Sequence, residues 1–155
     1  MWKEKGSALD QQKKYDEALK CYDKAIELYP AEDNSSSISA WVHKCNLPAE
    51  QGKYNDSLAC FDKTIAMFKP SGDSAYLWLN KGNLLNRIGE EQKKESALVE
   101  ALKCYDTALE LTPAWGKTNQ SIIVFMRNML LKYHPELLSL PVQPTPGKTD
   151  ANGNL

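Results

Sequence analysis

Apolar residues recur every three or four positions along most of this chain. Between residues 18 and 28, for example, one predicted face carries Ala18, Tyr22, Ala25 and Ile26. This spacing places side chains on one side of an α-helix, whereas a half-buried strand would alternate apolar and polar residues at every second position. The pattern therefore predicts an all-α protein.

The same helical segment occurs three times. Residues 18–28 read ALKCYDKAIEL, residues 57–67 read SLACFDKTIAM and residues 101–111 read ALKCYDTALEL. A tryptophan precedes each copy and a proline follows it, as in the pairs Trp2 and Pro30, Trp41 and Pro70, and Trp78 and Pro113. Repeats of this length predict stacked units that each pack on their neighbours, and such arrays form extended surfaces.

Small and aromatic residues occupy fixed places in each copy. The first unit has Trp2, Gly6, Leu9, Tyr15, Ala18, Tyr22, Ala25 and Pro30, and the third has Trp78, Gly82, Leu85, Gly89, Ala101, Tyr105, Ala108 and Pro113. This pattern resembles the tetratricopeptide repeat family. The resemblance covers residues 2–113 and implies a right-handed α-solenoid of antiparallel helix pairs.

The repeat domain is expected to span residues 1–134. Its repeats would cover about 2–30, 41–70 and 78–113, a closing helix would cover 114–134, and the Pro-containing tail, 135–155, is expected to be disordered. In the closing helix, a stripe should pack on unit three, made of Ile122, Phe125, Met126, Met129 and Tyr133. Val124 and Leu131 lie on the opposite face and suggest a second contact, although scattered exposed aliphatic residues are common.

Unit two departs most from the pattern. Cys45 stands where units one and three have glycine, and Pro48 should kink the first helix because it removes a backbone hydrogen bond. Within unit three, the charged stretch 90–100 adds length between the second and third copies of the repeated segment. It either extends both neighbouring helices or bulges outward.

Three of the four cysteines occupy the same place in each copy. Cys21, Cys60 and Cys104 would lie on different helices and lack the C-x-x-C spacing of zinc or redox sites. All four cysteines are therefore predicted to be packing residues, with neither a disulfide nor a metal.

Composition and motifs exclude several classes of function. The formal charge of −1 over 155 residues gives no net positive field for nucleic acid or an anionic membrane. No apolar run approaches the roughly 20 residues that span a bilayer, and the charged N-terminus lacks the apolar stretch of a secretory signal, so a cytoplasmic location is expected. A phosphate-binding loop, an H-E-x-x-H motif and a nucleophile elbow are all missing, which predicts a protein without enzymatic activity, cofactor or metal.

The family resemblance implies a concave groove lined by the first helix of each unit. By repeat register, the lining residues would be Lys3, Ser7, Asp10 and Gln11 in unit one, Val42, Asn46, Ala49 and Glu50 in unit two, and Tyr76, Leu79, Asn83, Asn86 and Arg87 in unit three. The expected occupant is an extended peptide or a partner segment. Asn46 and Asn83 share one register, where an amide can both donate to and accept from a partner's backbone.

One subclass of the family grips a terminal carboxylate through lysines, asparagines and an arginine. Only Lys3 matches that pattern, since the other positions hold Ser7, His43, Tyr76 and Asn80. A protein partner of neutral or mixed charge is therefore favoured, and the predicted role is that of a noncatalytic adaptor or scaffold. The alternatives are a subunit that self-assembles through its terminal helices and an RNA-binding repeat array, which the charge balance disfavours.

Overall fold

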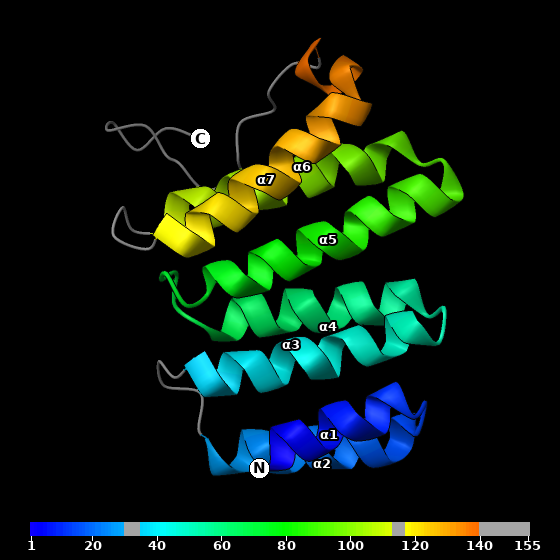
Figure 1. Ribbon diagram of the computed structural model, residues 1–155, viewed down its shortest axis with the longest axis vertical. Helices are drawn as coiled ribbons and strands as arrows, with labels where there is room; N and C mark the ends of the chain where they lie inside the picture. Colours follow the sequence, from blue (N-terminus) through cyan, green and yellow to red (C-terminus); the bar gives the residue numbers. More distant parts are fainter. Residues whose placement is uncertain (30–34, 113–116, 140–155) are drawn as a thin grey trace.

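The helices stack in pairs along one axis in the computed structural model, which describes residues 1–29, 35–112 and 117–139 (Figure 1). Within these ranges the regular structure is helical and there is no strand, which confirms the all-α prediction. The elements are α1 (Trp2–Gln11), α2 (Tyr15–Leu28), α3 (Ser35–Glu50), α4 (Tyr54–Met67), α5 (Ala75–Gln92), α6 (Glu95–Leu111), α7 (Lys117–Tyr133) and the short 3₁₀ helix η1 (Pro135–Ser139).

Three helix hairpins form the units, α1 with α2, α3 with α4 and α5 with α6, and the second helix of each also packs on the next unit. Each hairpin turn contains one residue at positive φ, namely Lys13 (59°), Gly52 (76°) and Lys93 (52°). A left-handed residue is a common way to end a helix and reverse the chain. The three hairpins are therefore joined by turns of the same kind, as repeated units should be.

Glycines allow the two helices of units one and three to pack closely. A Cβ atom added at Gly6 would lie 2.7 Å from Cε1 of Tyr22, and one added at Gly82 would lie 2.7 Å from Cε1 of Tyr105. Both tyrosines are fully buried. A side chain at either glycine would displace a large ring in a tightly packed core. The pairing of a glycine on the first helix with a tyrosine on the second therefore has a direct steric cause.

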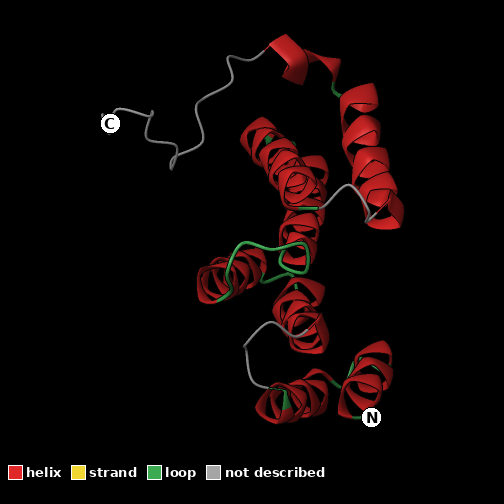
Figure 2. Cartoon of the chain, turned by 90° about the vertical axis from the view of Figure 1, so that its left-hand side faces the viewer, coloured by secondary structure: helices red, strands yellow, loops and turns green. Residues whose placement is uncertain are grey.

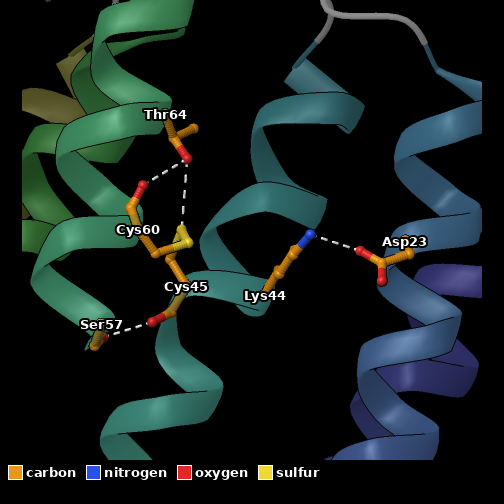
Figure 3. Close-up of a disulfide and its surroundings, with 6 residues drawn as sticks. All are labelled: Asp23, Lys44, Cys45, Ser57, Cys60 and Thr64. Carbon is orange, nitrogen blue, oxygen red and sulfur yellow. Dashed lines mark hydrogen bonds and ion pairs between the residues drawn. A yellow bond between two sulfur atoms is a disulfide. The ribbon is translucent and has the colours of Figure 1, made fainter. Parts of the chain in front are cut away.

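Unit two is joined differently, because Cys45 of α3 and Cys60 of α4 form a disulfide (Figure 3). The prediction that all four cysteines only pack was wrong for this pair. It holds for Cys21 and Cys104, which are buried free thiols at the repeat position of Cys60. Cys45 differs because it occupies the glycine position, which faces the second helix of the unit and brings its sulfur within bonding reach.

The two irregularities of the sequence lie at helix ends. Pro48 is in the last turn of α3, which continues only to Glu50, so its missing N–H affects the end of the helix. The expected kink stays a prediction. The added residues 90–100 lengthen both neighbouring helices, since α5 has 18 residues and α6 has 17.

Helix α7 is rotated from its expected orientation. Its core-facing residues are Ile123 and Leu130, which are buried, whereas Ile122, Phe125 and Tyr133 of the predicted stripe are exposed. Both faces carry apolar residues at helical spacing, so periodicity alone did not determine which one packs. Within the predicted stripe, Met126 does pack against the core cluster, whereas the three exposed residues do not.

The proposed second contact on α7 is also revised. Leu131 is partly buried and packs against the core cluster, while Val124 is 40% exposed. The two residues therefore do not form one exposed apolar surface. Leu131 thus borders the buried side of the helix instead of lying opposite the core, and the second contact stays a prediction.

His134 fastens the end of α7 to α5. Its Nε2 lies 2.5 Å from Oε1 of Glu90 and its Nδ1 lies 3.1 Å from Oε1 of Glu136. Just beyond, Leu137 of η1 is buried. Residues 135–139 of the expected disordered tail are thus folded onto the domain, and residues 140–155 lie outside the described residues.

We expect the contact of His134 with Glu90 and Glu136 to make the free energy of unfolding depend on pH. The hydrogen bond to Glu90 raises the pKa of His134, and two carboxylates satisfy both ring nitrogens only in the imidazolium form. Because the folded pKa is raised, the stabilisation is complete below the unfolded value of about 6.5 and disappears as pH rises through the folded value. Urea unfolding at about pH 6 should show His134→Gln to be less stable than the wild type, and at about pH 9 the difference should be lost. An equal difference at both pH values would contradict the ionic contact.

Candidate binding groove

Helices α1, α3, α5 and α7 line one side of the stack. Figure 2 shows the helix at the N-terminus and the last long helix projecting toward the same side, with the middle units set back between them. Three hollows follow one another along this side, here named the N-terminal, central and C-terminal hollows, and together called the groove.

The N-terminal hollow has a volume of about 370 Å³ and lies between α1 and α3. It brings together three of the predicted groove residues, Lys3, Ser7 and Gln11. His43 closes it from α3 and also lines the central hollow. Its ring stacks on Tyr22 with centroids 5.4 Å apart, and burial lowers its pKa, so a neutral imidazole links units one and two.

The central hollow, of about 350 Å³, lies between α3 and α5. Six predicted groove residues line it, together with Asn80: Asp10, Asn46, Ala49, Glu50, Asn83 and Arg87. An ion pair crosses it, because Nη1 of Arg87 lies 3.0 Å from Oε1 of Glu50, and Nη2 donates to the Ala49 carbonyl at 2.9 Å. The charge of Arg87 is therefore largely balanced within the protein.

The two asparagines of the shared register differ in what they can offer. The hydroxyl of Tyr105 donates to Oδ1 of Asn83 at 2.9 Å, which occupies the amide oxygen and leaves the NH₂ group. In unit two, Phe61 stands at the position of Tyr105 and has no hydroxyl. Asn46 thus keeps both its donor and its acceptor for a partner's backbone.

Three predicted groove residues lie elsewhere. Val42 and Leu79 are 2% and 8% exposed and belong to the core, so their inclusion in the groove was wrong. Burying such side chains stabilises a fold by about 1.5–3 kcal/mol each, which explains why they point inward. Tyr76 is 45% exposed near the start of α5 and lines none of the three hollows.

The C-terminal hollow was missed from the sequence. It has a volume of about 580 Å³ between α5 and α7, and its lining is Asn86, Glu90, Phe125, Met126, Met129, Leu130, Tyr133 and His134. Four of these belong to the apolar stripe that the sequence analysis assigned to the core, namely Phe125, Met126, Met129 and Tyr133. The groove therefore changes from polar at α1 and α3 to apolar at α7.

Within residues 1–29, 35–112 and 117–139, no three His, Cys, Asp or Glu side chains lie close enough together to hold a metal ion. None of the helices in these ranges has the length and apolar character needed to cross a membrane.

A known protein family matches the first hairpin. Residues 1–31 match the model of the tetratricopeptide repeat. The first hairpin is therefore a tetratricopeptide repeat. The match covers the first unit, whereas the membership of units two and three in the same repeat stays a prediction, supported by the shared turns and the buried aromatic residues. Tetratricopeptide repeats indicate a role in protein–protein interaction and are typically noncatalytic. A search of curated proteins gave no match.

Proposed function

We propose that this protein is a noncatalytic cytoplasmic adaptor that binds a segment of a partner protein in the groove. The observation that carries the proposal is the continuity of the three hollows. His43 lines the first two, and the neighbours Asn86 and Arg87 of α5 line the third and the second. One extended segment can therefore contact all three.

The lining of the groove favours a partner segment with an apolar anchor. The exposed rings of Phe125 and Tyr133 offer a large apolar contact at one end, where a buried aromatic or aliphatic side chain would supply most of the affinity. Toward α1, Asn46 can hold the backbone of the same segment. Because Arg87 pairs with Glu50 inside the groove, a strongly charged partner is not favoured.

Peptide selection tests this function. A peptide library displayed on phage and selected against the whole protein should yield binders whose NMR chemical-shift changes fall on α1, α3, α5 and α7. Phe125→Ala and Asn46→Ala should each weaken such a peptide by about tenfold, the scale of a moderate hot spot. Lys63→Ala on α4 is the matched surface control and should leave the affinity unchanged. Unaltered affinity in both groove variants would exclude this binding site.

A second copy of the chain is the alternative occupant of the apolar end. Ile122, Phe125 and Tyr133 are 50%, 60% and 64% exposed, and a contiguous apolar stripe of this kind often marks an interface. If the chain self-assembles there, sedimentation velocity should show dimers that grow with concentration and disappear in Phe125→Asp. Val124→Asp, on the other side of the buried face, should retain them. A wild-type protein that stays monomeric would eliminate this alternative.

A further inference from the structure

The disulfide of unit two lies between two helices and is held by its neighbours (Figure 3). The hydroxyl of Ser57 donates to the Cys45 carbonyl at 2.5 Å, and that of Thr64 donates to the Cys60 carbonyl at 2.8 Å. Oγ1 of Thr64 also lies 3.5 Å from Sγ of Cys45. Cys45 is fully buried and Cys60 is half-buried, so Cys60 is the cysteine of the pair that a molecule from solvent can approach.

This bond replaces the contact that joins the helices of the other units. In unit three, Gly82 lets Tyr105 pack directly on the backbone of α5. In unit two, Cys45 occupies the glycine position and Phe61 the tyrosine position, so a ring cannot pack on a bare glycine backbone there, and the disulfide joins the two helices instead. The pairing of α3 with α4 therefore depends on the covalent link more than the pairing in units one and three depends on any single contact.

Helix α3 connects the disulfide to the rest of the protein. Beside Cys45, Lys44 reaches Asp23 of unit one, with Nζ 2.7 Å from Oδ1 (Figure 3). One residue further along, Asn46 lines the central hollow, and Glu50 pairs with Arg87 of unit three. Any loosening of α3 against α4 thus reaches both neighbouring units and the middle of the groove.

We propose that Cys45–Cys60 is a thiol–disulfide exchange site for dithiol reductants, and that its opening loosens unit two. A thiolate of the reductant attacks Sγ of Cys60, the S–S bond breaks, and Cys45 leaves as a thiolate that takes up a proton. The second thiol of the reductant then attacks the reductant's first sulfur, which is bonded to Cys60 in the mixed disulfide. This releases Cys60 as a thiolate, which takes up a proton. The reductant ends as a disulfide and the protein has gained two electrons and two protons.

Both redox states are accommodated. In the reduced state, the new S–H of Cys45 has an acceptor in Oγ1 of Thr64, so opening the bond leaves no unmatched donor in the core. The exchange site stands independently of the proposed function, whereas its effect on the groove rests on that function.

Hydrogen exchange of the full chain tests the proposal, with dithiothreitol as the reductant. The bond closes a loop between residues 15 apart, so reduction should speed the exchange of α3 and α4 amides on the order of 100-fold while leaving α6 nearly unchanged. Cys60→Ala should show the fast exchange without reductant. Cys21→Ala removes the free cysteine at the same repeat position and should keep the full response to dithiothreitol.

The same samples decide the outcome. Alkylation of the air-oxidised, denatured protein should label only Cys21 and Cys104. Four labelled cysteines, or exchange of α3 that is equal in both redox states, would overturn the proposal. A selected groove peptide should bind the oxidised protein at least about tenfold more tightly than the reduced one. If hydrogen exchange changes on reduction but peptide affinity does not, only the link between the disulfide and the groove is rejected. If no peptide binds in either redox state, the proposed function is rejected, and the hydrogen-exchange result alone then decides whether the disulfide is an exchange site.

Discussion

Tyr105→Ala should lower the free energy of unfolding by about 3–5 kcal/mol, the usual cost of removing a buried aromatic ring. Tyr105 is fully buried, and its ring lies so close to Gly82 that no β-carbon fits between them. Alanine would leave a cavity between α5 and α6 that helix backbones cannot close, and the Asn83 amide would lose its hydroxyl donor. Urea unfolding followed by circular dichroism would measure the loss.

Two variants separate the causes of that loss. Tyr105→Phe keeps the ring and removes only the hydroxyl bonded to Asn83, so it should cost about 1 kcal/mol. Tyr76→Ala changes a tyrosine that is 45% exposed and should stay within about 0.5 kcal/mol of the wild type. If Tyr105→Ala were no more damaging than Tyr76→Ala, the packing of α5 against α6 would not be the one described.

The repeat explains why so much of the fold could be predicted. Where the same residue types recur at one register, such as Gly6 with Tyr22 and Gly82 with Tyr105, they mark a steric requirement of the helix pair. A pattern of this kind predicts which helices pair and where they cross. It also predicted the polar part of the groove, where Asn46 and Arg87 were found.

The sequence did not determine the structure where two different packings fit the same residue pattern. On α7, the faces around Phe125 and around Ile123 are both apolar, and only the packing against unit three selects Ile123. Cys45 was read as a small residue in place of glycine, since a sequence does not show that Cys60 lies opposite. Val42 was carried over by register alone, although its position faces the core.

Lys81 is a buried charge that the repeat pattern did not indicate. It is 8% exposed in α5, and its Nζ lies 2.7 Å from Asp62 of α4 and 3.4 Å from Glu100 of α6. Burial alone lowers the pKa of Lys81, but the hydrogen bond to Asp62 and the nearby carboxylates raise it above its usual value. The ammonium therefore joins three helices of two units while remaining charged.

Lys81→Glu should lower the free energy of unfolding by about 3 kcal/mol at neutral pH, second only to Tyr105→Ala among the substitutions described above. It buries a carboxylate beside two others. Lys81→Met keeps the length of the side chain and should cost less than about 1 kcal/mol, since Asp62 and Glu100 are more than half exposed and can be hydrated. Urea unfolding of both variants at neutral pH would measure this difference.

The pH dependence of Lys81→Glu distinguishes charge from packing. Burial and the neighbouring carboxylates would raise the pKa of the new carboxyl in the folded state above its unfolded value of about 4.3. Its penalty should therefore be largest above the folded pKa and shrink as pH falls, disappearing below the unfolded pKa, where the carboxyl is neutral in both states. Lys81→Met has no such group, so its difference from the wild type should change much less over the same range. Equal losses for the two variants at every pH would mean that packing, rather than the charge of Lys81, holds α4, α5 and α6 together at this point.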